Sequence, residues 1–111
     1  LANMRNGGAG CISATANVNP AAIDKLYREW RKHDAEMQQE ALNVVRKTVG
    51  QYIMIPALKQ VIAHYANDPA WATVRPPLTE LTAAQAKNVI DGLKKLDFEM
   101  PGLAQAHAKA A

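Results

Sequence analysis

The amino-acid sequence predicts an α/β fold to which this chain contributes one buried strand and otherwise α-helices. The strand is expected at residues 10–13, where Cys11 and Ile12 form a short apolar run directly after glycine, as in strands buried on both faces. Four later stretches repeat apolar residues at intervals of three and four, the spacing of amphipathic helices. A lone buried strand would leave its backbone N–H and C=O groups unpaired. The sequence therefore also predicts partner strands that these 111 residues do not contain.

The first helix is expected to follow the strand closely. Residues 7–20 read GGAGCISATANVNP, so a glycine turn precedes the strand and a loop of small polar residues follows it. Asn19 suits the N-cap position of a helix, and Pro20 suits its first turn. This helix should extend to residues 32–33. Its apolar stripe would consist of Ile23, Leu26, Tyr27 and Trp30.

Two further helices are expected in the middle of the chain. Asp34 can cap the first of them, which should end near Gly50. Pro56 is expected to open the next helix, because proline moves the residue before it out of helical geometry. The sequence Asn-Asp-Pro at residues 67–69 should close that helix.

The last helix follows an irregular arm. The sequence Arg-Pro-Pro at residues 75–77 excludes a regular helix within residues 71–79. Thr82 and Gln85 have the spacing of a capping box, which marks the start of the final helix. Gly92 costs this helix about 1 kcal/mol relative to alanine, so its presence predicts a close approach of another segment. The inward face should consist of Ala86, Val89, Ile90, Leu93 and Leu96.

The composition argues against several functional classes. Thirteen basic and ten acidic residues give a net charge of +3, and the basic residues are dispersed among acidic ones. Nucleic-acid binding calls for a one-sided basic patch, so no nucleic-acid partner is expected. No apolar run approaches the ~20 residues of a membrane-spanning helix, and no signal-peptide pattern is present. The single cysteine, Cys11, suits a reducing cytoplasm, which is the expected location.

The glycine-rich string also carries a resemblance to a known family. GGAGCISATANVNP resembles the last barrel strand and following loop of the dihydrodipicolinate synthase / N-acetylneuraminate lyase family. The resemblance continues through IPALK at residues 55–59, RPPL at residues 75–78 and the final helix. It covers essentially the whole chain, but only the C-terminal portion of the family. Members of this family are (β/α)8-barrel (TIM-barrel) lyases and aldolases that use a lysine Schiff base.

The resemblance implies a division of the chain into two parts. A complete (β/α)8 barrel needs roughly 250 residues. Residues 1–33 would then supply the last β/α unit of the barrel, and residues 34–111 a C-terminal three-helix bundle. The chain is accordingly expected to be part of a longer protein, and Leu1 in place of an initiator methionine agrees with that expectation.

The resemblance also implies where the substrate lies. The residue at the position of Ile12 offers its backbone carbonyl to the bound pyruvate-derived group, while Gly10 and Ser13 leave room for it. The Schiff-base lysine and a proton-relaying tyrosine belong to upstream strands, so no catalytic residue is expected in this segment. No cofactor and no metal are expected. Lys59 is interpreted as a helix-surface residue and not as the Schiff-base lysine.

Other candidate sites have plainer interpretations. The glycines at residues 8–10 precede the strand, whereas a dinucleotide-binding fingerprint needs a strand before them and a helix among them. Cys11 has apolar flanks and is interpreted as a buried, inert thiol. Arg75 is interpreted as anchoring the arm, with a bridge between subunits as the alternative. The histidines lack the clustering of metal ligands; they are His33, His64 and His107.

The function implied by the resemblance is that of a class I, pyruvate-dependent lyase or aldolase. The first choice within the family is a 4-hydroxy-tetrahydrodipicolinate synthase-like enzyme. The alternatives are N-acetylneuraminate lyase, a sugar-acid aldolase or dehydratase, or a non-catalytic helical binding module if the chain is complete. The expected partners are pyruvate, a small aldehyde, the rest of the barrel and further copies of the protein in a homotetramer or dimer.

Overall fold

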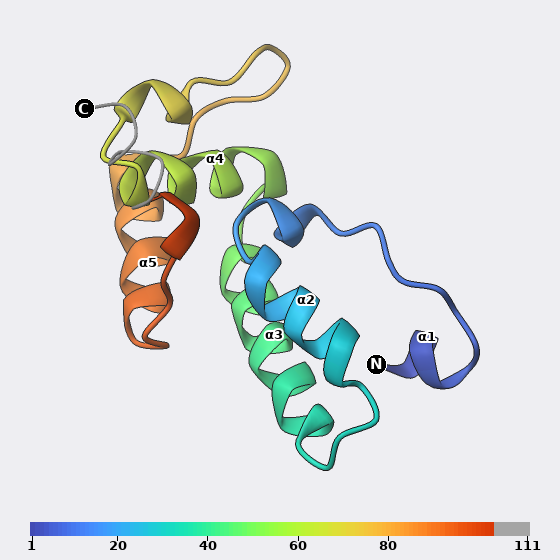
Figure 1. The fold of residues 1–111 in the computed structure, drawn as a ribbon. Helices are drawn as coiled ribbons and strands as arrows, with labels where there is room; N and C mark the ends of the chain where they lie inside the picture. Colours follow the sequence, from blue (N-terminus) through green and yellow to red (C-terminus); the bar gives the residue numbers. More distant parts are fainter. Residues whose placement is uncertain (104–111) are drawn as a thin grey trace. The chain divides into compact units, whose positions relative to one another are not determined.

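The computed structural model describes residues 1–103, and this part of the chain is mostly helical (Figure 1). It forms two compact units, one spanning Leu1–Lys47 and the other starting at Thr48. The elements follow in the order α1 (Ala2–Arg5), η1 (Ala14–Asn17, a 3₁₀ turn), α2 (Pro20–Glu29), α3 (Ala35–Val49), α4 (Met54–Tyr65), η2 (Pro69–Ala72, a 3₁₀ turn) and α5 (Ala83–Lys94). Residues 101–103 are again helical. The expectation that this segment is mostly α-helical is confirmed.

The predicted strand at residues 10–13 is not formed. Residues 8–13 have no regular secondary structure, and no β-strand occurs within residues 1–103. The physical reason is the one that the sequence indicates: a strand exists through hydrogen bonds to a neighbouring strand, and this chain supplies none. Ser13 nevertheless keeps an extended backbone, with φ −135° and ψ 131°.

In the first unit, α2 begins as predicted. Asn19 occupies the N-cap position with Pro20 in the first turn, and the Ile23 amide donates to the Asn19 carbonyl at 3.4 Å, but the Asn19 side chain makes no capping hydrogen bond. Leu26 is buried, but Tyr27, expected on the apolar stripe, is half-exposed. The helix ends at Glu29, a few residues earlier than its expected end.

A polar turn connects α2 to α3. The side-chain nitrogen Nε2 of Gln38 donates to Glu29 Oε2 at 2.8 Å and to Asp34 Oδ2 at 3.1 Å. This one side chain therefore links the end of α2 to the start of α3. Lys32 forms an ion pair with Glu29 at 2.8 Å. These contacts lower the pKa of Glu29, chiefly through the hydrogen bond from Lys32, and the pKa of Asp34, chiefly through that from Gln38.

In the second unit, α4 starts two residues before Pro56 and not at it. The first N–H groups of a helix have no intrahelical acceptor, so a proline anywhere in the first turn costs no hydrogen bond. The helix closes at the predicted place. Asn67 adopts a left-handed conformation with φ 51°, and the amide of Asp68 donates back to the Ala63 carbonyl at 3.0 Å, which is the pattern of a Schellman motif.

The arm between α4 and α5 is irregular, as predicted, except for the short turn η2 (Figure 1). The Asp68 carboxylate accepts from the Ala70 amide at 3.0 Å and so caps η2. The Trp71 ring of this turn lies with its centroid 5.9 Å from Lys59 Nζ on α4. Such a cation–π contact ties the turn to the helix it follows.

The predicted capping box of α5 is confirmed. Thr82 Oγ1 accepts from the Gln85 amide at 3.3 Å, and the Gln85 side chain accepts from the Thr82 amide at 3.0 Å. The close approach predicted at Gly92 is also found, because a Cβ atom there would lie 2.8 Å from Thr48 Cγ2. Of the five expected inward residues, three are buried: Val89, Ile90 and Leu93.

Leu96 was expected on the inward face of α5 and is 39% exposed. The reason is a second Schellman-type ending. Asp97 takes φ 50°, and the Phe98 amide donates to the Leu93 carbonyl at 3.2 Å. This turn places Phe98, and not Leu96, among the buried residues. Tyr65 Oη then donates to the Phe98 carbonyl at 3.0 Å and holds the turn against α4.

Candidate functional site

The segment that resembles a barrel strand presents its main chain to solvent. Ile12 is fully exposed, and Cys11 is exposed as well. Within residues 1–103, no hydrogen bond reaches the amide or the carbonyl of Ile12. The expectation that Cys11 is buried is therefore wrong for this chain, because the neighbouring strands that would cover its thiol are not part of it.

Asn3 fixes the turn that leads into this segment. The side-chain amide nitrogen of Asn3 donates to the Gly10 carbonyl at 2.6 Å. The backbone carbonyl of Asn3 accepts from the Gly8 amide at 2.8 Å. A Cβ atom on Gly8 would lie 2.3 Å from Asn3 Oδ1, so a larger residue there would displace the Asn3 side chain from this position. Gly7 has φ 83°, the left-handed region that glycine tolerates. The carbonyl of Gly10 is thus occupied, whereas that of Ile12 is available.

Two hydroxyl groups, those of Ser13 and Thr15, lie close together at the C-terminal end of the glycine-rich segment. Ser13 Oγ and Thr15 Oγ1 are 2.9 Å apart and form a hydrogen bond. Thr15 belongs to η1, where its carbonyl accepts from the amides of Val18 and Asn19 at 3.1 and 2.9 Å. Thr15 is 8% exposed, while Ser13 is half-buried. Sequence reasoning placed Ser13 at the site but missed Thr15, because residues 14–18 were expected to form only a loop.

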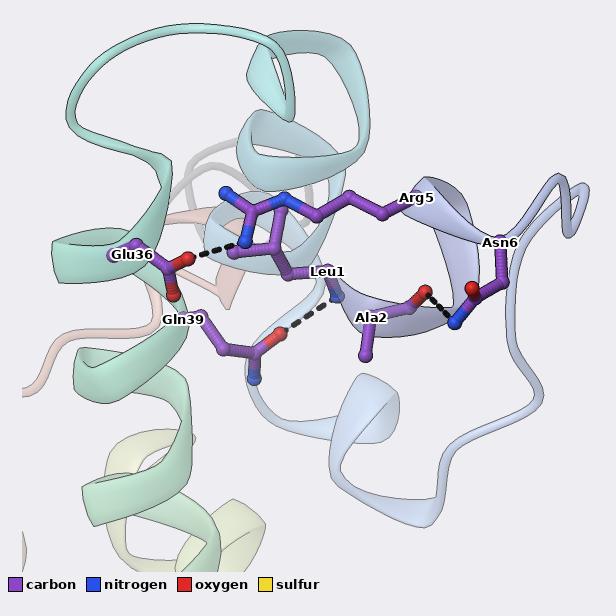
Figure 2. A network of polar contacts seen from close by, with 6 residues as sticks. All are labelled: Leu1, Ala2, Arg5, Asn6, Glu36 and Gln39. Atoms are coloured by element: carbon purple, nitrogen blue, oxygen red, sulfur yellow. Dashed lines mark hydrogen bonds and ion pairs between the residues drawn. The ribbon is translucent and has the colours of Figure 1, made fainter.

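A polar hollow near the N-terminal end of the described chain is a second candidate, and Figure 2 shows polar contacts among residues that line it. The Leu1 amino group donates to Gln39 Oε1 at 2.8 Å, and Arg5 forms an ion pair with Glu36. Both charged side chains of that pair are about half-exposed or more, so the pair contributes about 0–1 kcal/mol. The hollow holds no activated nucleophile and no acid–base pair, and we assign it a structural role.

The remaining candidates are not gathered into a site. His33 and His64 are both exposed, and His107 lies outside the described residues. Within residues 1–103, no group of three or more His, Cys, Asp or Glu side chains could hold a metal ion. The Arg75 side chain is exposed and makes no hydrogen bond or ion pair to the described residues, so the expected anchoring of the arm is not found. Lys59 is half-buried beside Trp71.

Comparison with known proteins identifies the family. The sequence pattern that describes the Dihydrodipicolinate synthetase family matches residues 1–96, which include the candidate site and all the named helices. No single curated protein and no solved structure matches the chain significantly. The helices described for residues 1–103 are all too short or too polar to traverse a lipid bilayer. Because the match extends over most of the 111 residues, this chain belongs to the dihydrodipicolinate synthetase family.

Proposed function

We propose that this chain is the C-terminal part of a class I, pyruvate-dependent lyase or aldolase. The observation that carries the proposal is the family match over residues 1–96, since members of this family are generally lyases and aldolases. Within the family, we propose a 4-hydroxy-tetrahydrodipicolinate synthase-like activity. N-acetylneuraminate lyase and sugar-acid aldolases or dehydratases are the alternatives, and residues on other strands would decide among them.

The proposed architecture is a (β/α)8 barrel whose last β/α unit is residues 1–33, followed by a helical bundle formed by residues 34–111. The free backbone groups of the segment support this assignment. Within residues 1–103, the amides of residues 9–13 make no backbone hydrogen bond, and Ser13 is already extended. Neighbouring barrel strands on both sides would pair these groups and cover Cys11. α2 would then be the helix that follows the last strand.

In this architecture the site lies at the carboxyl end of the last strand, as it does in (β/α)8 enzymes generally. The Ile12 carbonyl would accept a hydrogen bond from the bound pyruvate-derived group. Its freedom from any partner within the described residues supports this role. Gly10 and Ser13 have small side chains that leave space for the ligand next to Ile12.

The chemistry would be carried by residues outside this chain. A buried lysine on an upstream strand would condense with the ketone of pyruvate, forming an imine and releasing water. Loss of a proton from the methyl group gives an enamine, which adds to an aldehyde, and a tyrosine relays the protons. Desolvation lowers the pKa of such a lysine so that the neutral amine is available. No other cofactor is proposed.

The deciding experiment uses the native protein treated with pyruvate and sodium borohydride, with borohydride alone as the control. Intact mass should show a chain larger than 12.1 kDa that gains one reduced pyruvate adduct. Peptide mapping should place the adduct outside residues 1–111. An adduct on Lys59 would contradict the proposed role of this segment.

The other candidate functions are tested by the same mass measurement and by a further assay of binding. A native mass of 12.1 kDa with no adduct would favour a helical binding module instead. Strongly salt-dependent binding to nucleic acid would favour a nucleic-acid-binding function.

We propose in addition that the native enzyme is a homo-oligomer, a tetramer or a dimer, whose assembly the helical bundle supports. Light scattering of the native protein measures this directly.

A further inference from the structure

We propose that Asn6 is a site of spontaneous deamidation and that the turn at residues 5–10 controls how fast it is modified. The reaction is a covalent self-modification, in which the backbone nitrogen of Gly7 attacks the side chain of Asn6. This inference is independent of the proposed function, because it depends only on the chain around Asn6.

Asn6 differs from the other asparagines in the residue that follows it. Asn6 precedes Gly7, which has no side chain to shield its backbone nitrogen or to restrict its rotation. Both residues are exposed, so water and hydroxide reach them. The other asparagines precede methionine, valine, proline or aspartate; they are Asn3, Asn17, Asn19, Asn43, Asn67 and Asn88. Asn6 is therefore the asparagine that should react first.

The reaction needs no partner other than water. Hydroxide removes the proton of the Gly7 amide, and the nitrogen then attacks Cγ of Asn6. A C–N bond forms, the bond between Cγ and Nδ2 breaks, and the side-chain nitrogen takes a proton from water and leaves as ammonia. Water then opens the resulting five-membered succinimide at one of its two carbonyl groups. Opening at Cγ leaves aspartate at this position, and opening at the backbone carbon leaves isoaspartate, in which the main chain runs through the side chain.

The observed turn holds the two reacting groups apart. Asn6 has ψ 15°, so the Gly7 nitrogen is nearly eclipsed with the Asn6 backbone nitrogen and points away from Cβ. The succinimide ring requires the Gly7 nitrogen to lie beside Cβ instead. The Asn6 side chain is also held, because its Nδ2 donates to the Ala2 carbonyl at 2.9 Å. The reaction therefore requires a rotation about the Cα–C bond of Asn6, away from the observed conformation.

Three further hydrogen bonds resist this rotation. The Gly7 amide donates to the Met4 carbonyl at 3.1 Å. The Gly8 amide donates to the Asn3 carbonyl at 2.8 Å, and the Asn3 side chain donates to Gly10 at 2.6 Å. The rotation swings the chain from Gly7 onward, so these bonds must open first. The observed rate is thus the rate of the open chain multiplied by the fraction of molecules in which the turn is open.

Both products destabilise the turn. A carboxylate at this position cannot donate to the Ala2 carbonyl, and it places a negative charge at the C-terminal end of α1, where the helix dipole disfavours it. Isoaspartate adds one atom to the main chain between Asn3 and Gly10, which are joined by a hydrogen bond. We expect deamidation to weaken this bond and to release the chain that leads to Ile12.

The test follows the native protein during incubation at mildly alkaline pH, by peptide mapping with tandem mass spectrometry. Deamidation should be concentrated at Asn6, with both aspartate and isoaspartate as products. In guanidinium chloride, which unfolds the turn, the rate should rise about tenfold or more, because the opening no longer breaks several hydrogen bonds. Asn6→Gln should remove the signal at this position, because the longer side chain closes a six-membered ring more slowly.

Two variants that each remove one asparagine side chain test whether the turn controls the rate. Asn3→Ala removes the bond to the Gly10 carbonyl and should raise the rate at Asn6 about three to ten times, the effect of one neutral hydrogen bond. Asn17→Ala is the matched control, because it removes a bond of the same kind outside the turn, from Asn17 Nδ2 to the Ala14 carbonyl at 2.9 Å. It should leave the rate within about twofold of the wild type. In guanidinium chloride, both variants and the wild type should react at the same rate.

Several results would overturn the inference. If Asn6 reacts no faster than the other asparagines, in the native protein or in guanidinium chloride, the chemistry is refuted. Equal rates in the native and the unfolded protein, or an Asn3→Ala variant no faster than the wild type, would show that the turn does not control the reaction. An Asn3→Ala variant that reacts as fast as the unfolded chain would show that the whole unit unfolds with the turn, so that no local opening sets the rate.

Discussion

Replacing Gly92 by alanine sets two opposing effects against each other. Alanine is favoured over glycine inside a helix by about 1 kcal/mol. Against this, the new Cβ would lie 2.8 Å from Thr48 Cγ2, closer than carbon atoms approach, so the Thr48 side chain or the backbone beside it must move. Overpacking of this kind costs typically about 1–3 kcal/mol. We expect Gly92→Ala to destabilise the protein by about 1 kcal/mol net.

A second substitution shows whether the contact is the cause. Thr48→Ser removes Cγ2 and keeps the hydroxyl, so the alanine Cβ then has space. In that background Gly92→Ala should stabilise the protein by about 1 kcal/mol, because only the helix-propensity term remains. The change of sign corresponds to a coupling energy of about 1–3 kcal/mol between the two positions.

The assay is urea unfolding followed by circular dichroism, with the midpoint and slope compared among the four proteins. Gly102→Ala is the matched control, since a Cβ there would meet nothing within 4 Å. A Gly92→Ala variant that is more stable than the wild type would refute the reasoning, because it would mean that α5 has room for the methyl group.

Three further predictions concern the helix ends. Asp97→Gly should raise the free energy of unfolding by about 0.5–1 kcal/mol, since glycine adopts φ 50° without strain, and thermal unfolding measures this. Thr82→Ala should lower the free energy of unfolding by about 1 kcal/mol through loss of the capping box, whereas Thr82→Ser should lower it less. The folded-state pKa of Glu29 is lowered, so its stabilising effect is present above pH 4.5 and is lost as the pH falls through the folded-state value. Glu29→Gln should therefore flatten the loss of stability below pH 4.5, measured as urea midpoints against pH, and an unchanged slope would contradict it.

The features that the sequence predicts correctly are local ones. The capping box at Thr82, the N-cap at Asn19 and the helix ending near residue 67 depend on residues within a few positions of each other. Gly92 is also recognisable, because glycine inside an otherwise apolar-periodic helix needs a packing reason. These signals depend on residues close together in the sequence and not on distant parts of the chain.

The features that the sequence predicts wrongly depend on groups elsewhere. A strand at residues 10–13 and a buried Cys11 both require neighbouring strands that are not in this chain. Leu96 has the right spacing for the inward face, but the left-handed residue after it turns the chain before that face is complete.

The residues of the candidate site also differ in how far the sequence could identify them. Ile12, Gly10 and Ser13 were identifiable only through the resemblance of the glycine-rich string to a family. Thr15 and Asn3 were not identified, because their roles depend on how the turns around them orient one hydroxyl and one amide. The spacing of a serine and a threonine two residues apart is the signal that could have found the hydroxyl pair.

The open backbone of residues 9–13 has a consequence for handling this chain by itself. The amides of residues 9–13 and the carbonyl of Ile12 have no backbone partner within the described residues, and such open backbone is a template for another extended polypeptide. Two copies of this chain would therefore satisfy each other's backbone at high concentration, in the way that domain-swapped and aggregating proteins do. Co-expression with a polypeptide that supplies partner strands should therefore suppress this self-association.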